Sequence, residues 1–88
     1  MHPYDVILTK TAQKNYEKLP VKLQDGVDRC LIRLETSPKA GANIKRMEGH
    51  PGYYRFQVGG WRIVYHVNDE IHEVRVHDIR PRGDVYKH

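Results

Sequence analysis

The chain has 88 residues, with 15 Lys and Arg against 11 Asp and Glu and a formal net charge of +4, and this length predicts a single domain over residues 1–88. The excess of positive charge favours a polyanionic partner such as nucleic acid or an acidic protein. One cysteine excludes an internal disulfide, and no window approaches the roughly 20 apolar residues that cross a bilayer. The N-terminus lacks the pattern of a signal peptide, so we expect a soluble, cytoplasmic protein without a membrane partner.

The first part of the chain predicts one strand and two helices. Residues 4–8 have the composition of a short strand, and Thr9 or Thr11 can cap the helix that follows. Pro20 ends that helix, and a second helix over about residues 21–35 ends before Ser37-Pro38. Apolar residues at helical spacing form one face of each helix: Ala12, Tyr16 and Leu19 in the first, and Leu23, Val27, Cys30, Leu31 and Leu34 in the second. The short connection predicts an antiparallel helical hairpin.

From Ile44 onward the apolar residues alternate, which is typical of strands. Two alternating runs flank Gly59-Gly60 and predict a β-hairpin with a two-residue turn. The register that follows pairs, on one apolar face, Val58 with Trp61, Phe56 with Ile63 and Tyr54 with Tyr65. On the other face it pairs Gln57 with Arg62 and Arg55 with Val64. We interpret the aromatic residues of the first set as core residues.

A turn around residues 68–70 returns the chain as a further strand that ends near Arg80. An even-length loop places Val74 and Val76 on the apolar face, and it places Glu73, Arg75 and His77 on the polar face with His66. The two helices should cover the apolar face. The expected fold class is α+β: an N-terminal strand, an α-helical hairpin, and a twisted, mainly antiparallel β-sheet with helices packed on one face.

Arginines on the polar face are the main functional candidates. A charged, solvated face is usual for an antiparallel sheet, so charge alone does not indicate a site. However, Arg55 and Arg62 lie on neighbouring strands with Arg75 nearby, and like charges there destabilise a sheet unless an anion lies between them. Guanidinium groups bind phosphate in bidentate fashion. We therefore predict a phosphate-binding concavity. Its second wall is the tail, where Arg80 and Arg82 reach over the sheet edge and the ring of Tyr86 can stack on a base.

These motifs, in their order along nearly the whole chain, resemble the RelE/ParE superfamily of bacterial toxins, and RelE most of all. The segments that carry the resemblance are Ser37-Pro38, residues 54–65 (YRFQVGGWRIVY), Asn68-Asp69-Glu70 and residues 80–86 (RPRGDVY). The resemblance implies a RelE-like fold, similar to microbial ribonucleases, and the toxin of a type II toxin–antitoxin system. It implies an endoribonuclease that cuts mRNA in the ribosomal A site by attack of a ribose 2′-oxygen on the adjacent phosphate, without a metal ion or other cofactor. The implied partners are a cognate antitoxin, the ribosome and mRNA.

The resemblance also implies site residues. Arg55, Arg62, Arg80 and Tyr86 match the catalytic positions of RelE, and Arg80 is the candidate for the leaving-group side. One departure concerns the position two residues after Arg55, where RelE has a lysine and this chain has Gln57. Arginine almost never acts as a base, so the general base stays open among His66, His77, Glu48 and His50, or no protein group. Arg82, Gln57 and His77 are further candidates for catalysis or RNA binding.

Two other functions remain open at this point. A ParE-like toxin would inhibit DNA gyrase and cleave nothing itself, and the tail residues Arg80, Arg82 and Tyr86 argue for RelE instead. A non-catalytic RNA- or protein-binding module is the other, and Gln57 keeps it possible. The six histidines and one cysteine show no spacing typical of a metal site, and no glycine-rich loop precedes a helix.

Overall fold

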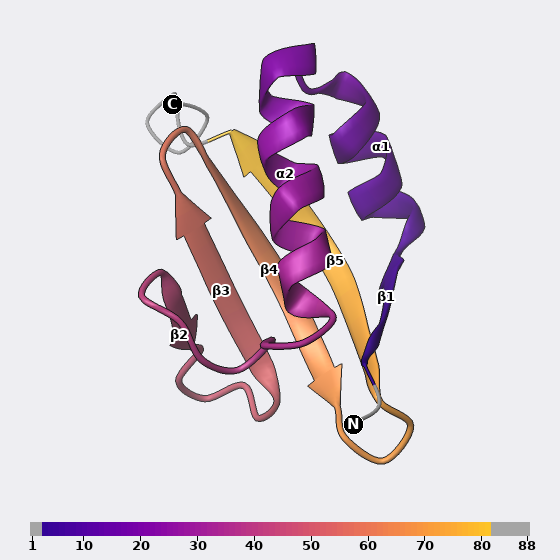
Figure 1. Cartoon of the computed structure of the whole chain (residues 1–88), viewed down its shortest axis with the longest axis vertical. Coiled ribbons are helices and arrows are strands. Elements are labelled where there is room, and N and C mark those ends of the chain that lie inside the picture. Colours follow the sequence, from indigo (N-terminus) through magenta and orange to yellow (C-terminus); the bar gives the residue numbers. More distant parts are fainter. Residues whose placement is uncertain (1–2, 82–88) are drawn as a thin grey trace.

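The computed structural model describes residues 3–81, so the predictions for Arg82 and Tyr86 lie outside the described residues. The elements in chain order are β1 (Asp5–Leu8), α1 (Lys10–Lys18), α2 (Val21–Leu34), β2 (Ile44–Arg46), β3 (Tyr53–Val58), β4 (Trp61–Asn68) and β5 (Glu73–Pro81). The strands form one sheet in the order β1-β5-β4-β3-β2. Figure 1 shows both helices on the same face of this sheet. The expected α+β architecture is confirmed.

The sheet is antiparallel except at one edge. β1 pairs with β5 in parallel, with Leu8 opposite Val76, and all other pairs are antiparallel. A parallel pair needs a connection that crosses over one face of the sheet, and the two helices lie in the connection that leaves β1. The sequence predicted the β1 strand but not its neighbour.

The helical hairpin begins and ends close to the predicted positions. Thr9 is the N-cap of α1, and its hydroxyl oxygen accepts a hydrogen bond from the backbone N–H of Ala12 at 3.2 Å. Side chains also join the two helices, because the Tyr16 hydroxyl donates to Asp28 at 2.7 Å and the Gln24 side chain donates to the Tyr16 carbonyl at 2.9 Å. These bonds hold the two helices together, so their apolar faces pack on the sheet as one surface.

The β3–β4 hairpin has the predicted register, with Val58 opposite Trp61 and Gln57 opposite Arg62. Gly59 adopts a φ of 49°, in the left-handed region that glycine accepts without strain. The predicted apolar face is the core: Phe56, Ile63 and Tyr65 are buried. The Tyr65 hydroxyl donates a hydrogen bond to the Pro38 carbonyl at 2.6 Å, so its buried polar atom is satisfied.

β5 departs from the predicted alternation at His77. Val74 and Val76 are buried as expected, but the ladder shifts between Val64 and Tyr65: Tyr65 pairs with Val76, whereas Val64 pairs with Asp78. His77 is therefore the extra residue of a β-bulge. Strict alternation would have exposed Ile79, and the bulge instead buries it at 1% exposure.

The bulge also corrects the predicted position of Arg80. Arg80 does not reach over the sheet edge: it lies within β5, directly opposite Arg62 on β4. β1 pairs with β5 only as far as Val76, so at Arg80 the strand is paired with β4 alone. The arginine assigned to the tail is thus part of the sheet.

Candidate functional site

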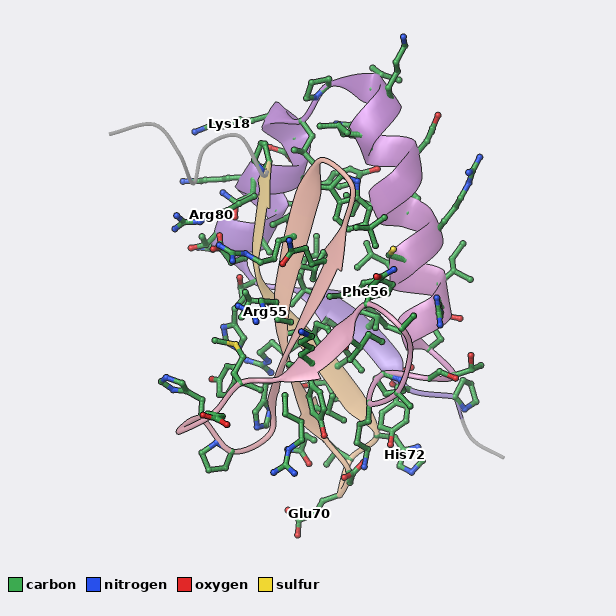
Figure 2. The ribbon with its side chains drawn as sticks, turned by 90° about the vertical axis from the view of Figure 1, so that its left-hand side faces the viewer. Lys18, Arg55, Phe56, Glu70, His72 and Arg80 are labelled. Atoms are coloured by element: carbon green, nitrogen blue, oxygen red, sulfur yellow. The ribbon has the colours of Figure 1, made fainter. Side chains whose placement is uncertain are left out.

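The sheet face opposite the helices carries the candidate residues in three rows that run across the strands. The rows follow from the strand pairing: Gln57, Arg62 and Arg80 form the first, Lys45, Arg55, Val64 and Asp78 the second, and Tyr53, His66 and Arg75 the third. Along β3 and β4, successive rows are separated by two residues, or about 7 Å. In Figure 2, Arg55 and Arg80 lie on the side of the sheet away from α2, and Phe56 points toward that helix.

Three arginines lie in the first two rows. Arg62 and Arg80 are direct neighbours across β4 and β5, and Arg55 is one row away on β3. Arg80 donates from Nε to Asp78 at 2.6 Å, whereas Arg55 and Arg62 form no ion pair with a carboxylate in residues 3–81. Adjacent like charges favour a bound anion, and guanidinium groups match the geometry of phosphate. These rows are therefore suited to hold phosphate.

A groove of about 400 Å³ extends this arginine surface toward the sheet edge at β2. Its lining includes Arg55, Gln57 and Lys45, and Lys45 lies directly opposite Arg55. The sequence reasoning missed Lys45, because β2 has only three residues and its pairing partner could not be identified from the chain. The alternation of buried Ile44 with exposed Lys45 was the available signal.

The histidines that were left open as bases lie in or beside the third row. The ring of Tyr53 lies 4.8 Å from that of His66, 5.4 Å from that of His77 and 6.3 Å from that of His50. Partial burial lowers the pKa of His77, and the neighbouring Arg75 and His66 lower it further. His66 and His77 lie on the polar face as predicted, and Glu48 is exposed in the loop between β2 and β3.

Arg75 lies farther from the other arginines than predicted. It pairs with His66, four residues along β4 from Arg62, which corresponds to about 13 Å along the strand. It also forms an ion pair with Glu73 at 3.1 Å. The arginine cluster of this face is therefore Arg55, Arg62 and Arg80.

Within residues 3–81, no group of three or more His, Cys, Asp or Glu side chains is arranged to hold a metal ion. Neither α1 nor α2 combines the length and the apolar character of a helix that crosses a membrane.

The fold and the site define a small α+β protein with an open, arginine-rich sheet face that is suited to bind phosphate. Comparison with known proteins identifies its family. Residues 6–86 match the family model described as the ParE toxin of the type II toxin-antitoxin system, parDE. The chain belongs to this toxin family, within the RelE/ParE superfamily that the sequence motifs resemble. It is therefore a toxin of a type II toxin–antitoxin system.

Solved structures support the same placement. The isolated RelE toxin of E. coli is 28% identical, with a TM-score of 0.79 over 89% of this chain and 83% of that chain. RelE in the archaeal RelE–RelB complex of Pyrococcus horikoshii OT3 is 25% identical, with a TM-score of 0.81 over 92% and 97%. The YoeB/ParE toxin of Agrobacterium tumefaciens shares the fold at 18% identity, with a TM-score of 0.76 over 88% and 96%. A search of curated protein sequences found no match.

Proposed function

We propose that this toxin is a ribosome-dependent, metal-independent endoribonuclease that cleaves mRNA in the ribosomal A site and thereby inhibits translation. The observation that carries the proposal is the pairing of Arg62 with Arg80 on an open face, with Arg55 one row away. The 28% identity to the E. coli RelE toxin supports it. The expected localisation is the cytoplasm, where the ribosome is found.

The proposed reaction proceeds through the RNA itself. The 2′-oxygen of one ribose forms a bond to the adjacent phosphorus, the bond from phosphorus to the 5′-oxygen of the next nucleotide breaks, the 2′-hydroxyl loses a proton and the 5′-oxygen gains one. The transition state places extra negative charge on the phosphate oxygens, and fixed cations stabilise it. Arg55 and Arg62 have this role. Arg80, oriented by Asp78 at 2.6 Å, hydrogen-bonds the departing 5′-oxygen.

Gln57 cannot accept the proton of the 2′-hydroxyl at neutral pH. It lies opposite Arg62 and contributes to the groove with Arg55, so it is placed to hydrogen-bond a ribose or phosphate oxygen. The arginines are not bases either. In this proposal most of the rate enhancement therefore comes from positioning of the RNA and stabilisation of charge in the transition state, which lower the barrier of many enzymatic reactions more than proton transfer does.

We propose a cognate antitoxin as the protein partner. Membership of a type II toxin–antitoxin family supports this, and solved structures hold the RelE toxins of E. coli and Pyrococcus horikoshii OT3 in complexes with RelB. The antitoxin would cover or disrupt the arginine surface. The ribosome and its mRNA are the proposed targets of the free toxin.

A second function has a specific observation in its favour. The family model that matches residues 6–86 carries the ParE description, and a ParE-like toxin would inhibit DNA gyrase without cleaving RNA. The arginine face could then contact an acidic protein surface or DNA. A test has to distinguish these two targets.

The test is primer extension on a defined mRNA programmed into purified ribosomes, with free mRNA beside it. The wild-type toxin should cut in the A-site codon only when ribosomes are present. Arg62→Ala should slow cleavage by about 100-fold or more, because one charge-stabilising donor is removed. Tyr86→Ala should also slow it. Arg29→Ala, which removes an exposed arginine from α2 on the other face of the sheet, should cleave at the wild-type rate.

Absence of cleavage by the wild-type toxin under all conditions would remove the nuclease proposal. The same preparation would then be assayed for inhibition of supercoiling by DNA gyrase. Equal loss in Arg62→Ala and Arg29→Ala would indicate a general effect of charge and not a site.

A further inference from the structure

At the third row of the polar face, Tyr53 and His66 form a cluster of rings with the neighbouring His77, and cleavage at the arginines does not require this cluster. The ring cluster consists of Tyr53 on β3, His66 on β4 and His77 on β5, with centroid distances of 4.8 Å and 5.4 Å from the central Tyr53. His50 lies at its margin, with a centroid distance of 6.3 Å. All three rings of the cluster are half-buried on a face without covering helices. The faces of these rings thus form a partly exposed surface beside the arginine cluster.

Backbone geometry holds two of these rings in place. Gly52 has a φ of 81°, and a Cβ atom at this position would lie 2.7 Å from Nε2 of His66. The backbone of the β2–β3 loop therefore packs directly against the imidazole, and the Gly52 carbonyl accepts a hydrogen bond from the N–H of Val67 at 2.9 Å. His77, the extra residue of the β-bulge, has its ring 5.4 Å from that of Tyr53. Both features orient the rings before any ligand binds.

The cluster lacks the features of an acid–base device. A catalytic histidine is commonly oriented by a carboxylate or carbonyl that accepts a hydrogen bond from its second ring nitrogen. In the part of the chain that the structure describes, the side chains of His66 and His77 have no hydrogen-bond partner and no carboxylate ion pair. Burial, Arg75 and His66 lower the pKa of His77, so its ring is neutral at pH 7. A neutral ring offers a π-face for stacking.

Cations lie on both sides of the cluster. Arg55 is the next residue of the polar face along β3, about 7 Å from Tyr53. Arg75 lies opposite His66 on β5, with its side chain 49% exposed. Aromatic rings between cations are the usual arrangement for single-stranded nucleic acid, in which bases stack and phosphates bind the charges.

We propose that Tyr53, His66 and His77 form a stacking subsite for one nucleobase of single-stranded RNA, one row from the arginine cluster. The inference deepens the proposed function and rests on it, because the same strand of RNA would pass from this subsite to Arg62 and Arg80. The subsite binds a base that flanks the scissile phosphate and takes no part in proton transfer.

The experiment measures binding of a short fluorescein-labelled RNA by fluorescence anisotropy. All riboses carry 2′-O-methyl groups, so the toxin cannot cleave the probe. Tyr53→Ala should weaken binding by about 5- to 150-fold, the range that corresponds to removal of one base-stacking side chain. Tyr53→Phe should bind as the wild type does. Tyr16→Ala, which removes a half-buried tyrosine from the helical layer, should also bind as the wild type does.

Probes with an abasic residue at each position in turn locate the stacked base without changing the protein. One position should lose affinity for the wild-type toxin, and Tyr53→Ala should show no further loss with that probe. This non-additivity separates direct contact from a general loss of stability. It also keeps the test decisive if Tyr53→Ala is poorly folded, because the wild-type toxin must still distinguish the abasic positions.

Three outcomes would overturn the subsite. If Tyr53→Ala binds normally while Arg62→Ala binds weakly, the arginine face stands and the subsite fails. If the wild-type toxin binds no RNA probe, the subsite fails, whereas the nuclease proposal is decided separately by the primer-extension assay on ribosomes. If His77→Gln leaves binding unchanged but removes one limb of the pH profile of ribosomal cleavage, the cluster acts in proton transfer and not in stacking.

Discussion

Single residues of the polar face differ in how their charges are satisfied. Arg80 is held by Asp78 and Arg75 by Glu73, both through exposed ion pairs, which contribute little stability. Arg55 and Arg62 lack such a partner among the described residues. Among the arginines of the polar face within residues 3–81, the two in the best position to bind phosphate are therefore the two without a carboxylate partner.

His77 should make the stability of the fold depend on pH. Its folded-state pKa lies below the ordinary value of about 6.5, so protons bind more tightly to the unfolded chain. The contribution of neutral His77 to the stability of the folded state is fully present above pH 6.5. It decreases as the pH falls through the lower, folded-state pKa. His77→Gln should therefore lose less stability between pH 7.5 and pH 5 than the wild type. Urea unfolding at both pH values measures this difference, and an equal loss in both proteins would contradict it.

Among the elements, β5 connects the core to the candidate site. Its bulge at His77 keeps Ile79 buried, at 1% exposure. Arg80, the residue after Ile79, therefore lies on the polar face, opposite Arg62. One extra residue thus satisfies both faces of the strand. Arg62 and Arg80 are neighbours because burial of Ile79 in the core places Arg80 on the opposite, polar face.

The burial of Ile79 can be tested by comparing the loss of stability in Ile79→Ala with that in Ile71→Ala. Ile79→Ala should destabilise the fold by about 2–5 kcal/mol, as removal of a buried isoleucine side chain does. Ile71→Ala, in the β4–β5 turn at 60% exposure, should change stability by less than about 0.5 kcal/mol. Thermal or urea unfolding measures both variants. Equal effects would show that strict alternation holds through β5 and that the bulge is absent.

The whole molecule separates its functions between two faces. Both helices cover one face of the sheet (Figure 1), and the arginines and rings lie on the other. At the β4–β5 turn, Asp69 accepts hydrogen bonds from Tyr4 at 2.6 Å and from Lys39 at 2.7 Å. These bonds join the turn to the N-terminal segment and to the loop after α2. These contacts support the fold without occupying the arginine face.

The division between faces predicts the salt dependence of RNA binding. Lys45→Ala removes a cation opposite Arg55 and should reduce the slope of log affinity against log salt by about 0.7, the value for one phosphate contact on a single strand. Lys22→Ala removes an exposed cation from the helical layer and should leave the slope unchanged. Anisotropy titrations over a range of salt concentrations measure both. Similar slopes for Lys45→Ala and the wild type would exclude Lys45 from the RNA path.

Much of the fold could be predicted because its determinants are local. Thr9 caps the first helix and Pro20 ends it, and both helices have an apolar face at helical spacing. For the candidate site, the sequence predicted the sheet face and the hairpin register of Arg55, Arg62 and Gln57, and the structure has both. Lys45 and the true position of Arg80 were missed, because each depends on a strand whose pairing or regularity the local pattern does not specify.

The sequence by itself determined the register of the central hairpin and the separation of an apolar from an arginine-rich face. It could do so because a two-residue turn and a period of two are properties of neighbouring residues. Only the tertiary structure decided the parallel pairing of β1 with β5 and the bulge at His77. It also decided the pairing of Arg62 with Arg80 and the contact between the rings of Tyr53 and His77. These contacts join segments distant in the chain, and they depend on which arrangement buries the apolar residues of every strand together.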